Sequence, residues 1–456
     1  MRRSSSLCVA ALVLGSAAFA SCKFTASLDG YTTEEGVGGS GGGVGGAGGG
    51  GAGGTSPDGG GGTGGGSGTG GSSAGSSGDS GTPDGDASNS DAPDSVGPDV
   101  VDTGGACGSG KIDCDGNEGN GCETDSTTDK NNCGACGHSC QGGDCKSSTC
   151  QPLVLASNQK IPWGIGVDAT TLFWSNQAAS VGQGEINSIP IAGGTVKSLA
   201  QSLSTPGDLA LDTTSVYWTN YSGAGEVKKV GKDGTGLANI TSGSGPWGLV
   251  LDTDTVYWTN SDGSIRKAPK AGGSSNTIVS GEQDPRGIAL DGSTVIWTAS
   301  VGGTISSASK ADGSNRTDVA TGQAFPIAIV VTSQAIYWVN TGSSYALGSC
   351  TKNDGSVMKL IKGQTTPVKL AQDQACPIKL TVDAESVYWT NAGTYTGNVY
   401  QYNGAVMKVP VGGGSAVSVA SNVIIPYGIA VDDTNVYWTS QGLGPSSGTL
   451  VRIVKK

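Results

Sequence analysis

A tryptophan that recurs at a nearly constant interval is the feature that most restricts how this chain can fold. Successive copies are 44, 40, 39, 41, 51 and 49 residues apart, at Trp174, Trp218, Trp258, Trp297, Trp338, Trp389 and Trp438. Each copy ends a shared phrase, which in the third repeat begins at Pro246. A period of about 40–45 residues with one aromatic signature per unit is typical of β-propeller blades. We therefore predict an all-β fold, a seven-bladed β-propeller over residues 151–456.

The shared phrase also predicts strands. The run 249–251 is short and apolar, which suits an inner strand, and Asp252 favours a turn because it can bond its own backbone. Residues 256–259 are β-branched and aromatic, which favours a second strand. The last repeat reaches only a third strand, 449–454, whereas 152–156 matches a fourth. We therefore expect the N-terminal strand to complete the last blade.

The end of the phrase resembles a known repeat. Tyr-Trp-Thr-Asn stands at 217–220, 257–260 and 388–391, and is similar to the YWTD repeat of the low-density-lipoprotein-receptor propellers. The resemblance covers the C-terminal 306 residues, 151 to 456. This chain differs in having Asn, Ala or Ser in place of the final Asp, and seven copies where that family usually has six blades. The resemblance implies a binding module rather than an enzyme.

The N-terminus is typical of a bacterial export signal. Two arginines precede an apolar run over 7–20, too short to span a bilayer, so residues 1–21 are predicted to be a signal peptide. Residues 19–22, Phe-Ala-Ser-Cys, resemble a lipobox, which implies lipidation of Cys22. Cysteine counting agrees, because Cys22 is left over once the others are paired. We expect an outer-membrane or cell-surface lipoprotein that meets the membrane through this anchor. The alternative is cleavage after Ala20 and a secreted protein.

Two further segments precede the propeller. Residues 22–105 are predicted to be the lipidated Cys followed by a disordered tether, because Gly, Ser and Asp dominate and no apolar periodicity is present. Residues 106–150 hold eight Cys and too few apolar residues for a core, so four disulfides are expected, with their pairing open. The run 132–140 resembles the cysteine-rich module of the stigma-specific protein family.

Metal sites in this module are weaker alternatives. Cys133, Cys136 and His138 have residue types that bind zinc, but an exported protein favours disulfides. Asp113, Asp115, Asn117 and Glu123 resemble a calcium loop, without the Gly that an EF-hand turn requires. We predict no metal and no cofactor.

Residues that differ between repeats are the candidates for function, because those present in nearly every blade, such as Asp212 and Tyr217, are needed by the ring itself. The position after the repeated Pro holds Trp163, Gly207, Trp247, Arg286, Ile327, Ile378 and Tyr427. The next position is mostly Gly but becomes Asp208 and Lys379. Both positions begin an inner strand, beside the channel mouth. We predict that Trp163, Trp247, Arg286, Tyr427, Asp208 and Lys379 bind a ligand; the alternative is that they cap the core.

Two long loops are expected on the same face. Blades five and six have the longest repeats, and their loops between strands two and three carry Tyr345 and Tyr395. Cys350 and Cys376 are predicted to form a disulfide that pins these loops. Pinned long loops beside an aromatic mouth favour partner binding, so both tyrosines join the predicted ligand-binding set.

Charge and residue types narrow the function. The net charge is −12, but 151–456 holds twenty acidic and twenty basic residues, and nucleic acid is not an expected partner. We predict no catalytic residues: virginiamycin B lyases use a propeller His, and the single histidine, His138, lies outside this propeller. The main hypothesis is a non-enzymatic surface protein that binds protein or carbohydrate. The alternatives are a metal-dependent, lactonase-like hydrolase and a purely structural envelope protein.

Overall fold

The described part of the chain is entirely β-structure and turns. The structure is a computed structural model that describes residues 107–117, 121–221, 225–343, 350–396 and 399–455. Within these ranges there is no helix, and hence none long and apolar enough to cross a membrane. The predicted signal peptide, Cys22, the tether and Tyr345 lie outside the described residues.

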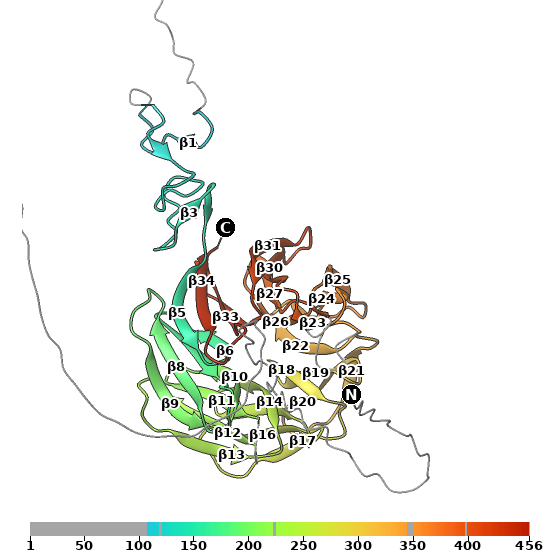
Figure 1. Cartoon of the computed structure of the whole chain (residues 1–456). Helices are drawn as coiled ribbons and strands as arrows, with labels where there is room; N and C mark the ends of the chain where they lie inside the picture. The colour runs from blue at the N-terminus through green and yellow to red at the C-terminus, as the bar shows by residue number, and fades with distance from the viewer. Residues whose placement is uncertain (1–106, 118–120, 222–224, 344–349, 397–398, 456) are drawn as a thin grey trace, which may run out of the picture. The chain divides into compact units, whose positions relative to one another are not determined.

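Seven four-stranded antiparallel sheets follow one another around a ring, which confirms the predicted seven-bladed propeller (Figure 1). Blades one to three consist of β6 (Pro162–Val167), β7 (Thr171–Asn176), β8 (Gly184–Pro190) and β9 (Lys197–Leu203); β10 (Pro206–Leu211), β11 (Ser215–Asn220), β12 (Glu226–Gly231) and β13 (Ala238–Ser242); β14 (Pro246–Leu251), β15 (Thr255–Asn260), β16 (Ile265–Pro269) and β17 (Asn276–Val279). Blades four to six consist of β18 (Pro285–Asp291), β19 (Thr294–Ala299), β20 (Thr304–Ser309) and β21 (Thr317–Ala320); β22 (Pro326–Val331), β23 (Ala335–Asn340), β24 (Gly355–Ile361) and β25 (Val368–Gln374); β26 (Pro377–Val382), β27 (Ser386–Asn391), β30 (Gly404–Pro410) and β31 (Val417–Val423).

The seventh blade closes the ring with strands from both ends of the propeller. Its sheet runs β32 (Pro426–Val431), β33 (Asn435–Ser440), β34 (Gly448–Val454) and then β5 (Leu153–Gln159). Arg452 and Val451 of β34 pair with Leu153 and Val154 of β5 in antiparallel register. The predicted completion of the last blade by the N-terminal strand is therefore confirmed.

Two adjacent side chains of the second strand join each blade to both of its neighbours. Successive side chains of a strand point to opposite faces, so the Trp and the residue before it meet different blades. Trp218 packs with Phe173 of the preceding blade, whereas Tyr217 packs with Trp258 of the following one. The same alternation recurs in seven clusters around the ring. The seven repeated Trp side chains are at most 1% exposed, so they form the core between blades.

The residue two positions after the Trp accepts from its buried indole N–H in blades two, three and six, whereas Gln159 and Gln323 accept in blades one and five. In blade three Trp258 Nε1 donates to Asn260 Oδ1 at 3.1 Å. Blade four has Ala299 at this position and blade seven has a serine. Among the described residues, Nε1 of Trp297 and of Trp438 is buried without a hydrogen-bond partner. In these two blades, the residue that replaces the final Asp of the YWTD pattern therefore leaves a buried hydrogen-bond donor without an acceptor.

In five blades the hydroxyl directly after the Trp makes a hydrogen bond to the next blade. Thr259 Oγ1 accepts from Gly248 N in its own blade at 3.0 Å and donates to the Arg286 carbonyl of the next blade at 2.7 Å. Thr219 and Thr390 donate in the same way to Trp247 and Tyr427. The Thr side chain, rather than the last residue of the phrase, therefore carries this inter-blade bond.

Among the described residues, ion pairs reinforce five of the seven junctions. Lys270 of blade three lies 3.1 Å from Asp212 of blade two. Equivalent pairs are Lys232–Asp168 at 2.8 Å, Lys310–Asp252, Lys362–Asp291 at 2.7 Å and Lys455–Asp383 at 2.6 Å. Burial acts to raise the pKa of Asp212, but hydrogen bonds from two backbone amides, Tyr217 and Lys270 outweigh it and hold this pKa well below its usual range. Burial and the bond to Asp212 raise the pKa of Tyr217 to about 12. The repeated Asp and Tyr thus hold the blades together.

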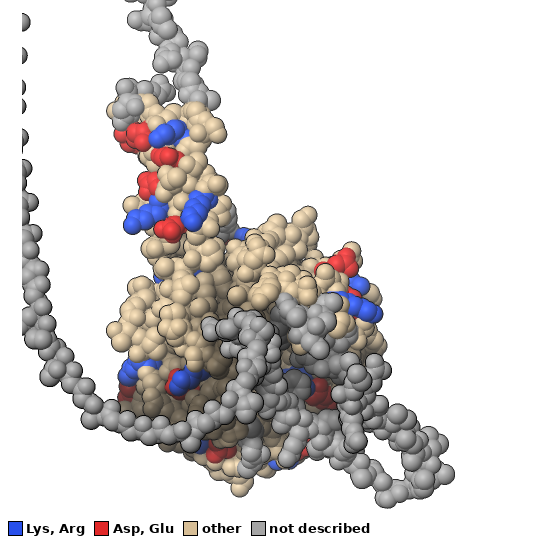
Figure 2. Space-filling view, viewed as in Figure 1, with Lys and Arg blue, Asp and Glu red and all other residues tan. Residues whose placement is uncertain are grey.

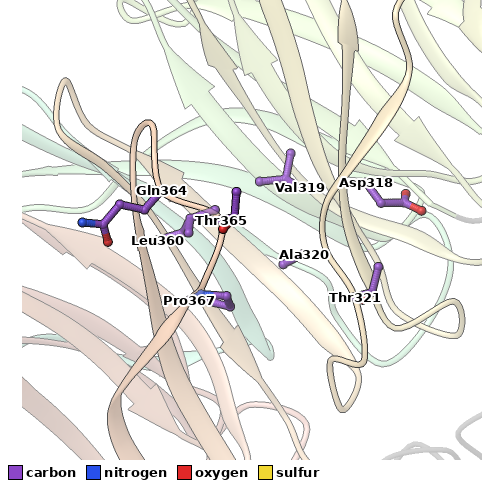
Figure 3. Close-up of a pocket in the computed structure, with 8 residues that line it drawn as sticks. All are labelled: Asp318, Val319, Ala320, Thr321, Leu360, Gln364, Thr365 and Pro367. Carbon is purple, nitrogen blue, oxygen red and sulfur yellow. The ribbon is translucent and has the colours of Figure 1, made fainter.

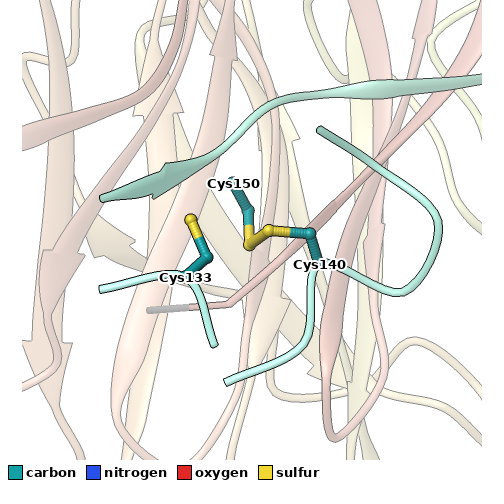
Figure 4. A group of neighbouring side chains, drawn as sticks. All are labelled: Cys133, Cys140 and Cys150. Atoms are coloured by element: carbon teal, nitrogen blue, oxygen red, sulfur yellow. A yellow bond between two sulfur atoms is a disulfide. The ribbon is translucent and has the colours of Figure 1, made fainter. Parts of the chain in front are cut away.

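The cysteine-rich segment is held by four disulfides and four two-residue strands: β1 (Lys111–Ile112) with β2 (Thr124–Asp125), and β3 (Cys145–Lys146) with β4 (Thr149–Cys150). The bonds are Cys107–Cys122, Cys114–Cys136, Cys133–Cys145 and Cys140–Cys150. Figure 4 shows the Cys140–Cys150 bond beside Cys133. The predicted disulfides are confirmed, and the zinc alternative is wrong because Cys133 and Cys136 are both oxidised.

Restoring the missing indole acceptor should stabilise the propeller. We expect Ala299→Asn to raise the free energy of unfolding by about 1 kcal/mol, because it gives Trp297 Nε1 the partner that Trp258 has. The reciprocal change, Asn260→Ala, should lower it by about 1–3 kcal/mol, because it leaves a buried donor without an acceptor. Urea unfolding followed by tryptophan fluorescence measures both. Equal stability of all three proteins would contradict this account of the repeat.

Candidate functional site

The seven inner strands bring their first residues together around the central channel. Each inner strand begins with the repeated Pro, so the two variable positions that the sequence singles out are its second and third residues. The third is usually Gly because neighbouring inner strands approach closely. A Cβ on Gly248 would overlap the Arg286 carbonyl oxygen, and one on Gly428 would overlap that of Trp163. The variable residues therefore lie on a rim where the backbones of neighbouring blades are in close contact.

Asp208 and Lys379 meet across this rim. They belong to blades two and six, which are not neighbours in the ring, and Lys379 Nζ lies 2.5 Å from Asp208 Oδ2. The side chain of Lys379 is 23% exposed and that of Asp208 is 22% exposed. The charge of Asp208 is thus neutralised by Lys379.

The aromatic residues of the rim lie in two groups. Trp163 of blade one packs against Tyr427 of blade seven, with ring centroids 3.7 Å apart and the ring planes tilted by 36°. In the second group, the Arg286 guanidinium lies 3.9 Å from the Trp247 ring centroid. Tyr221 packs against the same Trp247 ring, with centroids 4.4 Å apart. Sequence reasoning missed Tyr221, although it directly follows the Tyr-Trp-Thr-Asn of blade two.

The Cys350–Cys376 disulfide is present and lies against the rim. Both sulfur-bearing side chains and Ile378 are buried in one cluster, against which Ile327 and Tyr427 pack. Tyr395 N donates to the Cys350 carbonyl at 2.7 Å, so the loop of blade six is tied to that of blade five. Tyr395 begins a small hairpin, β28 (Tyr395–Thr396) with β29 (Val399–Tyr400). The bond therefore links both long loops to the mouth.

A strained backbone position precedes the rim in every blade, and the sequence analysis did not foresee it. The residue before each repeated Pro has a positive φ: Ile161, Thr205, Gly245, Asp284, Phe325, Cys376 and Ile425. In each blade its carbonyl accepts a backbone N–H from the residue three positions after the Trp. Only one of the seven is Gly, the residue that adopts this conformation without steric cost. The repeated Pro was the available signal, but its neighbour's conformation was not readable from it.

Other features of the described surface lie away from the mouth. A cavity of about 500 Å³ lies between β21 and blade five, lined by residues that include Val319, Leu360 and Pro367 (Figure 3). A second, of about 550 Å³, is lined by blade-two residues such as Lys229. In Figure 2, acidic and basic residues lie beside one another on a mostly uncharged surface. Neither cavity includes a predicted site residue.

The acidic residues of the cysteine-rich segment do come together. Carboxylate oxygens of Asp113, Asp115 and Glu123 lie within 4.8 Å of one another. Asp113 accepts the Gly116 N–H at 2.8 Å. The bond from the Cys114 N–H holds the pKa of Glu123 below its usual range. These are exposed, locally bonded turn carboxylates, so their geometry does not require a cation.

Solved structures share the propeller fold. No protein-family model matches the chain. No curated protein matches it either. A virginiamycin B lyase from Staphylococcus aureus is similar, with a TM-score of 0.53 and 15% identity over 67% of this chain and 99% of that one. A catalytically inactive variant of a lyase of that name and organism, in which a histidine is replaced by alanine, was solved with quinupristin. It has a TM-score of 0.52 and 15% identity over 67% of this chain and 99% of that one. A chain of a nidogen/laminin complex has a TM-score of 0.39 and 24% identity over 50% of this chain and 85% of that one. At these identities the lyase structures show the fold alone.

The ion pair across the mouth should be energetically coupled. We expect Lys379→Met to destabilise the propeller more than Lys379→Met combined with Asp208→Asn, because only the single change leaves a half-buried carboxylate without its cation. A double-mutant cycle by urea unfolding should give a coupling of about 1 kcal/mol, since the pair is partly solvated. The same cycle on Glu226 and Lys228, which pair within one strand, is the control. If the two substitutions changed the free energy of unfolding by strictly additive amounts, the contact between Asp208 and Lys379 across the channel would be contradicted.

Proposed function

We propose that this protein is a non-enzymatic binding protein whose propeller binds a protein or carbohydrate ligand over the mouth of its channel. The observation that supports this is the rim itself, where Trp163, Tyr427, Trp247 and Arg286 are each partly exposed. Trp, Tyr and Arg are the residues that dominate binding hot spots. Their packing against each other, and the disulfide beside them, preorganise the surface and so lower the entropy lost on binding.

The channel mouth offers little to the enzymatic alternatives. A calcium-dependent hydrolase needs several oxygen ligands in the channel, whereas Asp208 is bonded to Lys379. The related lyase variant that lacks one histidine is catalytically inactive, and residues 151–456 contain no histidine. Among the described residues, the rim therefore presents neither a set of oxygen ligands for a metal nor a histidine like the one whose replacement inactivates that lyase.

Removing the aromatic rim should separate binding from architecture. We expect Trp163→Ala, Trp247→Ala and Tyr427→Ala together to lower affinity at least about tenfold, as loss of central hot-spot residues does. Binding of the purified full chain to a glycan array and to a phage-displayed peptide library measures this, with circular dichroism to verify the fold. The matched control is Leu237→Ala with Val417→Ala, two exposed apolar residues away from the rim. A wild-type chain that binds neither library would favour the purely structural alternative.

We also propose that the chain is exported and anchored through a lipid on Cys22, with residues 22–105 as the spacer. The support is the signal-like sequence before Cys22 and the odd cysteine count, since ten other cysteines of the exported chain are paired in disulfides. The alternative is a secreted protein.

Cys22→Ser should release the protein from membranes. After expression in a Gram-negative host, we expect the wild type in the detergent-extracted membrane fraction and the variant in the soluble fraction. Metabolic labelling with an alkyne fatty acid should mark the wild type only. Unlabelled, soluble wild-type protein would favour the secreted alternative.

A further inference from the structure

The rim is chemically divided into two parts. Two variable positions in each blade flank the repeated Pro that begins the inner strand: the positive-φ residue before the Pro and the residue after it. In blades five, six, seven and one these are Phe325 and Ile327, Cys376 and Ile378, Ile425 and Tyr427, and Ile161 and Trp163. In blades two, three and four they are Thr205 and Gly207, Gly245 and Trp247, and Asp284 and Arg286. All eight residues of the first set, here called the apolar crescent, are apolar or disulfide-bonded.

Contacts join five members of the apolar crescent across its four blades. Ile327, the disulfide, Ile378 and Tyr427 pack in and against one cluster. Tyr427 then packs against Trp163, with ring centroids 3.7 Å apart, which carries the crescent into blade one. Apart from the buried Cys376 and Ile378, its members are only partly buried, so their side chains reach solvent. Four consecutive blades thus present apolar side chains on one side of the mouth.

Backbone strain at three crescent positions indicates that their side chains have a role beyond forming the turn. Ile161, Phe325 and Ile425 have φ of 55°, 55° and 47°, a region that β-branched and bulky residues rarely adopt. Blade three has Gly245 at the same position, with the same turn and the same carbonyl bond from Ser261 N. Gly would therefore serve the fold at lower cost in the other blades. Strained positions that persist against a cheaper alternative are characteristic of functional sites.

The charges of the rim favour an uncharged ligand. Lys379 is paired with Asp208, and Arg286 lies 2.9 Å from Asp284. The rim therefore directs no unpaired charge from these residues toward an acidic or basic group. Arg286 and Tyr221 pack against Trp247, and Tyr427 packs against Trp163, so part of each ring already contacts another side chain and less of it is open to a sugar ring. An apolar peptide segment needs contact area rather than an open ring.

From this division we infer that the ligand is a protein, and that it docks through an uncharged segment rich in aliphatic or aromatic residues laid over the apolar crescent. This inference rests on the proposed function, since it names the ligand of the same mouth. The polar side, with Arg286 and the Asp208–Lys379 pair, borders the bound segment.

The positive-φ positions allow a test that separates contact from folding. Replacing Ile161, Phe325 and Ile425 together by Gly removes three crescent side chains and relieves backbone strain, so the melting temperature should stay within a few degrees of wild type. Replacing the same three by Asn, which also tolerates this φ, keeps side-chain volume but makes it polar. Both variants leave the predicted aromatic residues in place. The matched control is Thr205→Gly, the same strain relief on the polar side.

Selection of a phage-displayed peptide library on the full chain, with a glycan array in parallel, gives the result. We expect wild type and Thr205→Gly to enrich uncharged apolar peptides, and both triple variants to bind a selected peptide about tenfold more weakly or worse. Enrichment of charged peptides, or undiminished binding by folded triple variants, would overturn the inference. A large fall in melting temperature of the Gly variant would show that the side chains serve the fold, and would also overturn it. Glycan binding without peptide binding would overturn this inference and leave the proposed function standing, whereas binding to neither would remove both.

Discussion

The interaction on which the whole ring depends is the burial of two neighbouring side chains on opposite faces of one strand. Trp218 reaches back to blade one while Tyr217 reaches forward to blade three, so a single dipeptide fixes both junctions of its blade. Burying one Trp removes roughly 150–250 Å² from water. That contribution is large enough to build a core in a chain with 81 glycines. Hydrogen bonds from the Thr hydroxyls and Lys–Asp ion pairs add to the stability of the junctions that the buried aromatic side chains form.

Sevenfold repetition of that junction leaves the mouth as the place where the blades can differ. The inner strands must approach so closely that Gly248 and Gly428 have no room for a Cβ. At the start of the inner strands, variation is therefore greatest at the positions beside the repeated Pro. Chemical asymmetry there, with an apolar side and a polar side, is not demanded by the symmetric core, and this is what makes it informative about ligands.

The sequence was sufficient for the architecture because each blade repeats a local signal. The Trp spacing predicts blade number, and the strand-like run before the first repeat predicts closure by β5. The contact between Asp208 and Lys379 was only partly predictable: both residues break the repeat, but 171 positions separate them, and only the ring geometry brings them together. The positive φ before each Pro was not predictable, because that residue is usually extended. The division of the rim becomes visible only when those residues are placed in blade order.

Closure by β5 also determines how the propeller would carry a mechanical load. The described residues before 153 are joined to the ring covalently through this one strand, and Gln141 accepts hydrogen bonds from Asn435 and Arg452 of the same blade. A pull along β5 loads its hydrogen bonds with β34 together, in shear, rather than one after another. The six remaining blades have no chain end and are loaded only through their neighbours. The blade that closes the ring is therefore also the blade through which a load from the N-terminal segment enters the propeller.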